Sequence, residues 1–192
     1  MLPIDWQAEI DRHYGTGAPG DPRAGLRALL LKHSRQVADL AVAIARRLKL
    51  PLDEDDIVAG AMLHDIGIVA TDAPGIGCHG REPYLRHGIV GAAMLRADGL
   101  PEWTARIAER HTGAGITAAD IAAVGLPLPP GDYTPQTLLE QLICYADKYY
   151  SKSGDMRRKP LERVRRSMAR FGAGAVSRLE ALVAEFGDCS RD

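Results

Sequence analysis

Apolar residues recur with helical spacing along most of this 192-residue chain. In the segment 21–49, for example, Leu26, Leu30, Val37 and Ile44 fall on one stripe of a helix. Such a stripe packs against the protein core when the helix folds. No segment keeps up the alternation of apolar and polar residues that is typical of a strand. The pattern therefore predicts an all-α fold without a sheet.

Capping and turn residues divide this pattern into helices. We expect helices at about residues 21–49, from 53 onward, and at 84–97, 101–112, 134–151, 160–171 and 173–187, with a short one after Thr117. Asp53, and Thr117 with Asp120, are typical helix starts, because their side chains accept hydrogen bonds from free N–H groups. Residues 71–83 are rich in Gly and Pro, which predicts a loop. We expect an N-terminal segment 1–20, a single domain 21–151, and C-terminal helices 152–192 packed on that domain.

Six polar residues interrupt the apolar stripes. They are His33, His64, Asp65, His87, His111 and Asp147. A single histidine on an apolar face is more often a hydrogen-bonded core residue than a metal ligand. Five helices that each aim an imidazole or carboxylate inward are not independent, because every buried polar group needs a partner. One metal centre would satisfy all six side chains, and the pattern predicts such a centre.

The order of these six residues resembles the HD-domain superfamily of metal-dependent phosphohydrolases, in its HDIG form with ligands for two metals. The matching motifs are LKHSRQVADLA, AGAMLHDIGI, RHGIVGAAMLRADGLP, ERHTGAGIT and CYADKYYSK, spread over roughly residues 20–151. The resemblance implies a helical HD-domain bundle with a C-terminal helical extension. It also implies that His33, His64, Asp65 and Asp147 hold one metal. The second metal would take His87, His111 and the other oxygen of Asp65.

The implied ligands determine the expected cofactors and reaction. Nitrogen and oxygen donors without a thiolate suit Fe, Mn, Co, Ni or Zn. We expect two divalent transition-metal ions, and Fe or Mn is favoured over Co, Ni or Zn. Two such ions can activate water for attack on phosphorus. We therefore expect a phosphohydrolase that hydrolyses a nucleotide or another small phosphate ester. Asp65 would act through the metals, and Lys148 and Arg110 are candidate phosphate contacts.

Other residues near the motifs carry weaker expectations. Tyr84 and Ser151 share a helix face with a ligand, but capping or packing is the expected role of both. His79 lies in the loop between the ligands, which could form a lid. Ile68 stands where many phosphodiesterase relatives have a lysine, and the GYP elements of cyclic-dinucleotide phosphodiesterases are missing. Both observations count against a cyclic dinucleotide as substrate.

Two alternatives stay open at this point. Some small HD-domain proteins use the same ligands for a mixed-valent di-iron centre, which activates oxygen to cleave an organophosphonate or a polyol. The segment 22–27 lacks the tyrosine and glutamate of the phosphonate-cleaving type, which counts against it. The other alternative is a non-catalytic sensor that binds a nucleotide through its metals.

The C-terminal basic run favours a surface helix over an RNA contact. Its arginines and lysines between residues 157 and 170 are interleaved with Leu161, Val164, Met168 and Phe171 at helical spacing. Apolar residues at such spacing form the buried face of an amphipathic helix, and the charged residues then face solvent.

Composition narrows the class of protein further. The net charge of −1 predicts no general affinity for nucleic acid or for acidic membranes. No apolar run reaches the length of a membrane span, and the N-terminus lacks a signal-peptide pattern. Cys78, Cys144 and Cys189 lie in unrelated contexts and predict reduced thiols. We therefore expect a cytoplasmic protein with no nucleic-acid partner. The sequence leaves a homo-oligomer open.

Overall fold

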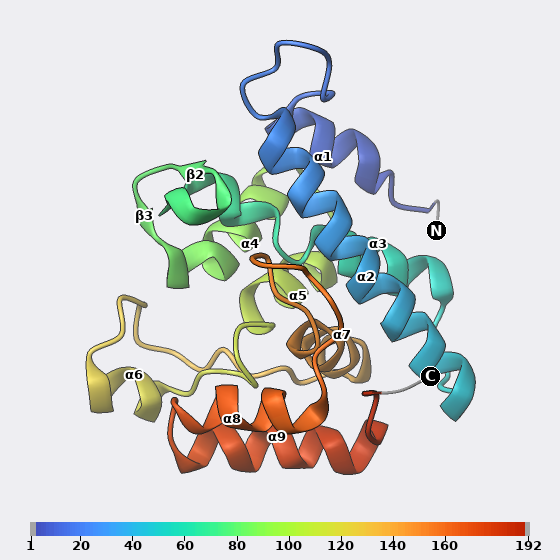
Figure 1. Ribbon diagram of the computed structural model, residues 1–192, viewed down its shortest axis with the longest axis vertical. Coiled ribbons are helices and arrows are strands. Elements are labelled where there is room, and N and C mark those ends of the chain that lie inside the picture. The colour runs from blue at the N-terminus through green and yellow to red at the C-terminus, as the bar shows by residue number, and fades with distance from the viewer. Residues whose placement is uncertain (1–2, 191–192) are drawn as a thin grey trace.

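The computed structural model describes residues 3–190, and helices dominate that part of the chain (Figure 1). The helices are α1 Trp6–Tyr14, α2 Ala24–Leu48, α3 Glu54–Leu63, α4 His87–Ala97, α5 Glu102–Arg110, α6 Ala118–Val124, α7 Leu138–Lys148, α8 Leu161–Ala169 and α9 Ala173–Phe186. Short 3-10 helices cover Ile66–Ala70, Pro74–Ile76 and Tyr84–Arg86. The predicted all-α fold is confirmed.

The expectation of no sheet is wrong in one place. Strands β1 (Thr71–Ala73), β2 (Cys78–His79) and β3 (Glu82–Pro83) form a small sheet in the order β2-β1-β3. β1 pairs antiparallel with β2 and parallel with β3. Strands of two or three residues are too short to produce a visible alternation of apolar and polar positions, so the sequence pattern indicated only a loop.

Local hydrogen bonds explain where the helices begin. Asp53 caps α3, and Thr117 with Asp120 forms the expected capping box of α6. Asp21 instead accepts a hydrogen bond from the backbone of Arg23, so Asp21-Pro22 forms a turn and α2 begins only at Ala24. For the same kind of reason α7 begins after Thr137, whose side chain accepts from the Glu140 backbone, and not at 134.

The N-terminal segment contains a helix that the sequence pattern did not predict. Ile10 and Tyr14 of α1 are fully buried. The Tyr14 hydroxyl donates to the carbonyl of Ile66 at 2.7 Å and accepts from the backbone N–H of Val69 at 3.2 Å. Because Ile66 and Val69 belong to the 3-10 helix that follows Asp65, α1 fixes the position of that turn.

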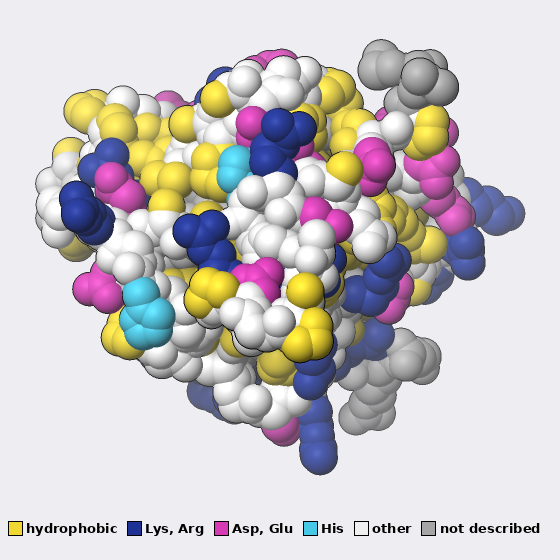
Figure 2. All heavy atoms as spheres, turned by 90° about the horizontal axis from the view of Figure 1, so that it is seen from above, with side chains coloured by type: hydrophobic (Ala, Val, Ile, Leu, Met, Phe, Trp, Pro, Cys, Tyr) yellow, Lys and Arg dark blue, Asp and Glu magenta, His cyan; other side chains and the backbone are white. Residues whose placement is uncertain are grey.

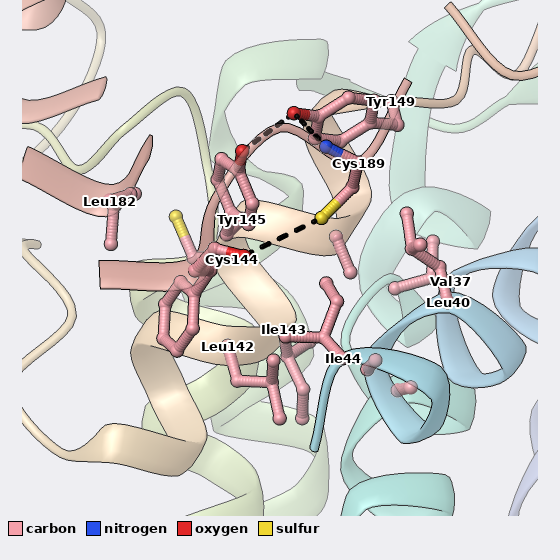
Figure 3. Close-up of a cluster of buried hydrophobic side chains, with 14 of the residues drawn as sticks. Val37, Leu40, Ile44, Leu142, Ile143, Cys144, Tyr145, Tyr149, Leu182 and Cys189 are labelled. Carbon is pink, nitrogen blue, oxygen red and sulfur yellow. Dashed lines mark hydrogen bonds between the residues drawn. The ribbon is translucent and has the colours of Figure 1, made fainter. Parts of the chain in front are cut away.

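The main core lies between α2, α7 and the C-terminal helices. In Figure 3, Val37, Leu40 and Ile44 of α2 face the side of α7 that carries Leu142 and Ile143. A second cluster packs α1 and the first half of α2 against α3, α4 and α5. The two clusters leave room between them for the buried polar residues of the next section.

The C-terminal part of α7 holds the end of the chain. The hydroxyls of Tyr145 and Tyr149 are hydrogen-bonded at 2.6 Å, and Tyr149 also accepts from the backbone of Cys189 at 3.3 Å (Figure 3). Cys189, Cys78 and Cys144 are all buried and free.

The basic helix α8 is amphipathic, as expected, with one exception. Leu161, Val164 and Met168 are buried against the core, whereas Phe171 is 63% exposed. Phe171 follows the last residue of α8, where the chain turns toward α9, so the helical spacing no longer applies to it. Figure 1 shows α8 and α9 at one end of the molecule.

The surface carries mixed charge on the face that Figure 2 shows. Lysine and arginine side chains lie among aspartates and glutamates there, as a net charge of −1 implies. Within residues 3–190, no helix is both long enough and apolar enough to cross a bilayer.

Candidate metal centre

The structure brings the six interrupting residues together at one place between the helices. His33 comes from the middle of α2, His87 is the first residue of α4, and Asp147 lies in the last turn of α7. His64 and His111 follow the last residues of α3 and α5. All five are buried, as is Asp65 beside His64.

The end of α3 explains how two adjacent residues can face one site. On a continuous helix, neighbouring side chains point about 100° apart. α3 ends at Leu63, and Asp65 has φ −104° and ψ 10°, outside the helical region. This local change of backbone direction lets the Asp65 side chain turn toward the same centre as His64.

The first of two groups of potential ligands contains His33, His64, Asp65 and Asp147. His33 Nε2 lies 3.0 Å from Asp147 Oδ1 and 3.2 Å from Asp65 Oδ2. His64 Nε2 lies 3.0 Å from Asp65 Oδ2 and 3.6 Å from Asp147 Oδ1. Four nitrogen and oxygen donors thus surround one small volume.

The second group contains Asp65, His87 and His111. Asp65 Oδ1 lies 3.4 Å from His87 Nε2 and 3.3 Å from His111 Nε2. The two ring nitrogens lie 3.0 Å apart. Asp65 therefore directs one carboxylate oxygen to each group, as a bridge between two cations would require.

Backbone carbonyls orient three of the imidazoles. Nδ1 of His64, His87 and His111 lies 2.6, 2.7 and 2.8 Å from the carbonyl oxygen of the residue three positions earlier. Since a carbonyl only accepts, Nδ1 carries the proton and donates. In a neutral ring, Nε2 then presents its lone pair to the centre, the arrangement of a metal-ligating histidine.

Several buried polar atoms of the centre have no hydrogen-bond partner. They are His33 Nδ1, His64 Nε2 and both oxygens of Asp65, and the Asp65 oxygens lie within ion-pair distance of Lys152 and the histidines without a regular hydrogen bond. Leaving a buried polar atom such as His64 Nε2 unsatisfied costs about 1–3 kcal/mol. The nearby nitrogen and oxygen donors, without a thiolate, are the set that a divalent transition metal binds. The residues present therefore fit a metal ion.

The charges of the centre follow from burial and from neighbouring groups. Burial alone would raise the pKa of Asp65, but His64 and Lys152 outweigh it and hold that pKa well below its usual range. Burial would lower the pKa of His64, but Asp65 and the other nearby carboxylate raise it to about 9. Burial and the adjacent His111 lower the pKa of His87 to about 3. Asp65 is thus ionised and His87 neutral at pH 7, the forms that bind metals, whereas His64 is protonated without an ion and would release its proton when one binds.

Lys152 is a residue of the centre that sequence reasoning missed. Its ammonium lies 2.6 Å from Asp65 Oδ2 and 6.0 Å from the centre of the Tyr84 ring. The Tyr84 ring stacks on His87 with centroids 4.8 Å apart. Lys152 lies beyond the end of α7, so helical spacing from Asp147 gave no signal for it. Tyr84 packs against a ligand, as expected.

The two predicted phosphate contacts lie in different surroundings. Lys148 is buried, and its ammonium contacts Asp147 Oδ2 at 2.8 Å and the carbonyl of His111 at 3.1 Å. Arg110 instead contacts Glu140 Oε2 at 3.3 Å. Lys148 is therefore part of the centre, whereas the contacts of Arg110 tie α5 to α7. A catalytic role for either stays a prediction.

The remaining candidates lie outside these contacts. His79 is exposed on β2, and its pairing with Asp72 belongs to the small sheet. Ser151 is half-buried after the end of α7. Their functional roles stay predictions as well.

A third group of potential ligands lies between α1 and the end of α4. His13 Nε2 contacts Glu9 at 3.1 Å and Asp98 at 2.7 Å. Arg12 lies 3.4 Å from Glu9 and 4.0 Å from Asp98. Because Arg12 and His13 both contact the two carboxylates, we interpret the group as a structural link between the helices.

Comparison with known proteins gives a family match. A family profile described as HD domain matches residues 30–151. The crystal structure of the HD domain of the phosphodiesterase PgpH from L. monocytogenes superposes with a TM-score of 0.50. It covers 82% of this chain and 91% of that one at 17% sequence identity, so the likeness concerns the fold.

Two of the curated relatives are named as tRNA methyltransferases. The chain is 39% identical over 135 residues to a tRNA (cytidine(56)-2'-O)-methyltransferase of Thermoplasma volcanium. It is 35% identical over 123 residues to a protein of the same name from Picrophilus torridus. These matches cover 70% and 64% of this chain but only 35% and 32% of the relatives, so the chain spans about a third of their length. An uncharacterized protein of Methanocaldococcus jannaschii is 40% identical over 62% of this chain and 64% of its own length.

These relatives contradict three expectations from the sequence. Their names describe a tRNA methyltransferase, whereas we expected a phosphohydrolase with a small phosphorylated substrate and no nucleic-acid partner. The expectations failed because metal ligands determine which ion is bound and leave the reaction open. In addition, a net charge of −1 averages over the whole surface. It does not reveal the lysines, such as Lys148 and Lys152, that lie at the centre.

Proposed function

Because this chain belongs to the HD-domain family, we propose that it binds divalent metal ions between its helices and uses them to bind tRNA during tRNA modification. The observation that carries this proposal is the similarity to tRNA methyltransferases across the site. An aligned stretch of 135 residues in a chain of 192 must include the middle of the chain, and His64, Asp65, His87 and His111 lie there. The metal centre is thus inside the region that this chain shares with a protein named for its action on tRNA.

The geometry supports a centre of the HDIG type with two ions. His33, His64, Asp65 and Asp147 would hold the first ion. The second would take the free oxygen of Asp65 together with the two remaining histidines. The donor set favours Mn or Fe, and Co, Ni or Zn would also fit. Such ions, when bound, attract and polarise phosphate oxygens.

Two lysines beside the metal centre also support phosphate binding, in addition to the metal ions. Lys148 and Lys152 lie at the centre, where burial strengthens the attraction of a cation for phosphate. Tyr84 limits the space beside Lys152 and supports His87. An RNA phosphate next to the metals would therefore meet two lysines, and neutralising phosphates is the main source of protein affinity for RNA.

A tRNA-binding measurement tests the proposal. Labelled tRNA is titrated with the protein loaded with Mn²⁺, with the chelated protein, and with the loaded Asp65→Ala variant. Asp72→Ala is the matched control, because Asp72 is an exposed aspartate on β1. We expect chelation and Asp65→Ala to weaken tRNA binding at least about tenfold, and Asp72→Ala to leave it unchanged. Equal tRNA affinity in the loaded and chelated protein would refute the role of the metals.

Lys152→Met is expected to weaken tRNA binding without loss of metal. The substitution removes an ammonium at the centre and keeps an unbranched apolar side chain. A hydrogen bond to a charged group contributes about 1.5–3 kcal/mol, which corresponds to roughly 10–100-fold in affinity. Lys49→Met, at the exposed end of α2, should change tRNA affinity less than twofold, by roughly the effect of one surface charge. Metal analysis of both variants checks that neither has lost its ions. Unchanged tRNA binding in Lys152→Met would exclude Lys152 as a phosphate contact.

A further inference from the structure

A cavity of about 690 Å³ adjoins the metal centre. Asp147 and Lys148 line it at the side of the centre, and its other walls come from the turn after α5 and from α6, α8 and α9. These helices form the lower part of the molecule in Figure 1. Cavities of this size bind small ligands or parts of larger ones. α8 and α9 lie beyond residues 30–151, so the HD-domain match does not account for this cavity.

The walls of the cavity are largely apolar and its rim is unusually exposed. Ile116, Val164 and Met168 contribute to the walls. At the rim, Val124 is 74% exposed and Phe171 is 63% exposed. Within residues 3–190, these are two of the three large hydrophobic side chains that are exposed. An exposed aromatic side chain beside an apolar cavity is a surface on which a flat ring can stack.

The cavity also contains a cation that forms no direct ion pair within residues 3–190. Lys159 lines the cavity, and in the described part of the chain no carboxylate lies within ion-pair distance of its ammonium, although the charge of Asp147 acts on it. Burial lowers the pKa of Lys159 to about 8, as expected for an ammonium that lacks a partner. Arg178, by contrast, is already bound to Asp120 at 2.6 Å and to the carbonyl of Gly115 at 3.0 Å. Lys159, like the exposed Arg170 that also lines the cavity and within residues 3–190 is hydrogen-bonded only to Ser167, is therefore a group that an anion would neutralise.

We propose that this cavity binds one unstacked nucleotide of an RNA strand. The base lies against Val164 and Met168, a neighbouring base stacks on Phe171, and the phosphate contacts Lys159 on the side of Asp147. Proteins commonly bind single-stranded RNA in this way, with unstacked bases on aromatic side chains and the backbone on lysine or arginine. The inference rests on the proposed function for the identity of the nucleic acid, and it assigns the C-terminal helices a part in binding.

Ala123→Trp tests the cavity directly. Ala123 lines the cavity but is exposed on α6, so a large side chain there fills space without disturbing the core. Ala122→Trp is the matched control, since Ala122 is the exposed preceding residue and does not line the cavity. A single-stranded RNA hexanucleotide is titrated with the Mn²⁺-loaded protein. We expect about tenfold weaker binding in Ala123→Trp, because a base–aromatic contact contributes about 1–3 kcal/mol, and no change in Ala122→Trp.

Lys159→Met tests the phosphate contact in the same titration. Arg166→Met is its control, because Arg166 is exposed on α8, which begins two residues after Lys159, and does not line the cavity. We expect the hexanucleotide to bind about tenfold more weakly to Lys159→Met than to Arg166→Met. Similar losses in both variants would mean that general surface charge binds the RNA, and the inference would be wrong.

A fluorescence measurement tests whether a base stacks on residue 171 at the edge of the cavity. In Phe171→Trp, a stacked base should quench the introduced indole as the hexanucleotide is added, with the same midpoint as the binding curve. Absence of quenching with RNA bound would overturn the stacking on this residue.

The outcomes separate this inference from the proposed function. tRNA binding that depends on Asp65 but is unaffected by Ala123→Trp would reject the cavity and keep the metal-dependent function. The opposite result is also informative. If Ala123→Trp abolishes hexanucleotide binding and Asp65→Ala leaves tRNA binding unchanged, the cavity is supported and the role of the metals is rejected.

Discussion

Asp65→Ala is expected to remove most of the bound metal from this protein. The wild type should carry about two ions per chain, because the two ligand groups lie side by side and each has enough donors for one ion. Asp65 is the residue that both groups share, one oxygen to each. Its loss removes a ligand from both ions at once and leaves the imidazoles without their bridging negative charge. Metal analysis of freshly purified protein measures the effect.

The controls for this variant follow from the same geometry. Asp72→Ala removes an exposed aspartate and should keep the full metal content. His87→Ala affects only the second group, so about one ion should stay bound. Equal metal content in the wild type and in Asp65→Ala would show that Asp65 is not the bridge.

Gly67→Ala is expected to destabilise the fold by about 1–3 kcal/mol, the usual cost of overpacking. A methyl group at this position would lie 2.1 Å from the carbonyl oxygen of His87 and 2.4 Å from the backbone nitrogen of Gly91. Both are backbone atoms of α4, which cannot move aside as a flexible side chain could. The 3-10 helix after Asp65 would have to separate from α4, and His87 would shift with it.

A second glycine provides the control for this variant. Gly75 has no atom within 4 Å of the place where a methyl group would lie. Gly75→Ala should therefore leave the free energy of unfolding within about 0.5 kcal/mol of the wild type. Denaturant unfolding of both variants makes the comparison. A Gly67→Ala variant as stable as Gly75→Ala would show that the close contact with α4 is relaxed in solution.

The helical fold could be predicted because its signal repeats along the chain. The stripe that contains Leu30, Val37 and Ile44 extends over a helix of 25 residues, and this helix is buried along it. The small sheet could not be predicted, because its strands have only two or three residues. Helix α1 was missed as well, although Ile10 and Tyr14 fall four residues apart and are fully buried.

The site could be predicted only for residues within regular elements or at their ends. Histidines that interrupt an apolar stripe give a signal at helical spacing, and His33 is the clearest case. Lys152 gives none, because the chain leaves α7 at Lys148 and returns to Asp65 through an irregular segment. The prediction that Phe171 belongs to the buried face of a helix was wrong for the same reason. Its spacing continues that of α8, but the helix ends before it and the side chain is exposed.

The function was harder to predict than the clustering of the six residues, because metal ligands determine which ion is bound and do not identify the substrate. Overall charge suggested no nucleic acid, whereas the curated relatives are named for tRNA. Lys148 and Lys152, which are paired with Asp147 and Asp65, and the neighbouring Lys159 show how a nearly neutral chain can still place several lysines close together.

The central claim is that six side chains, on five helices or directly after them, hold two metal ions on the two sides of Asp65. Crystals of the Mn²⁺-loaded protein, measured at a wavelength where manganese scatters anomalously, test this claim directly. The account predicts two anomalous peaks, one among His33, His64 and Asp147 and the other between His87 and His111, each next to an oxygen of Asp65. A map with no peak at Asp65, or with manganese only at other places on the protein, would contradict it.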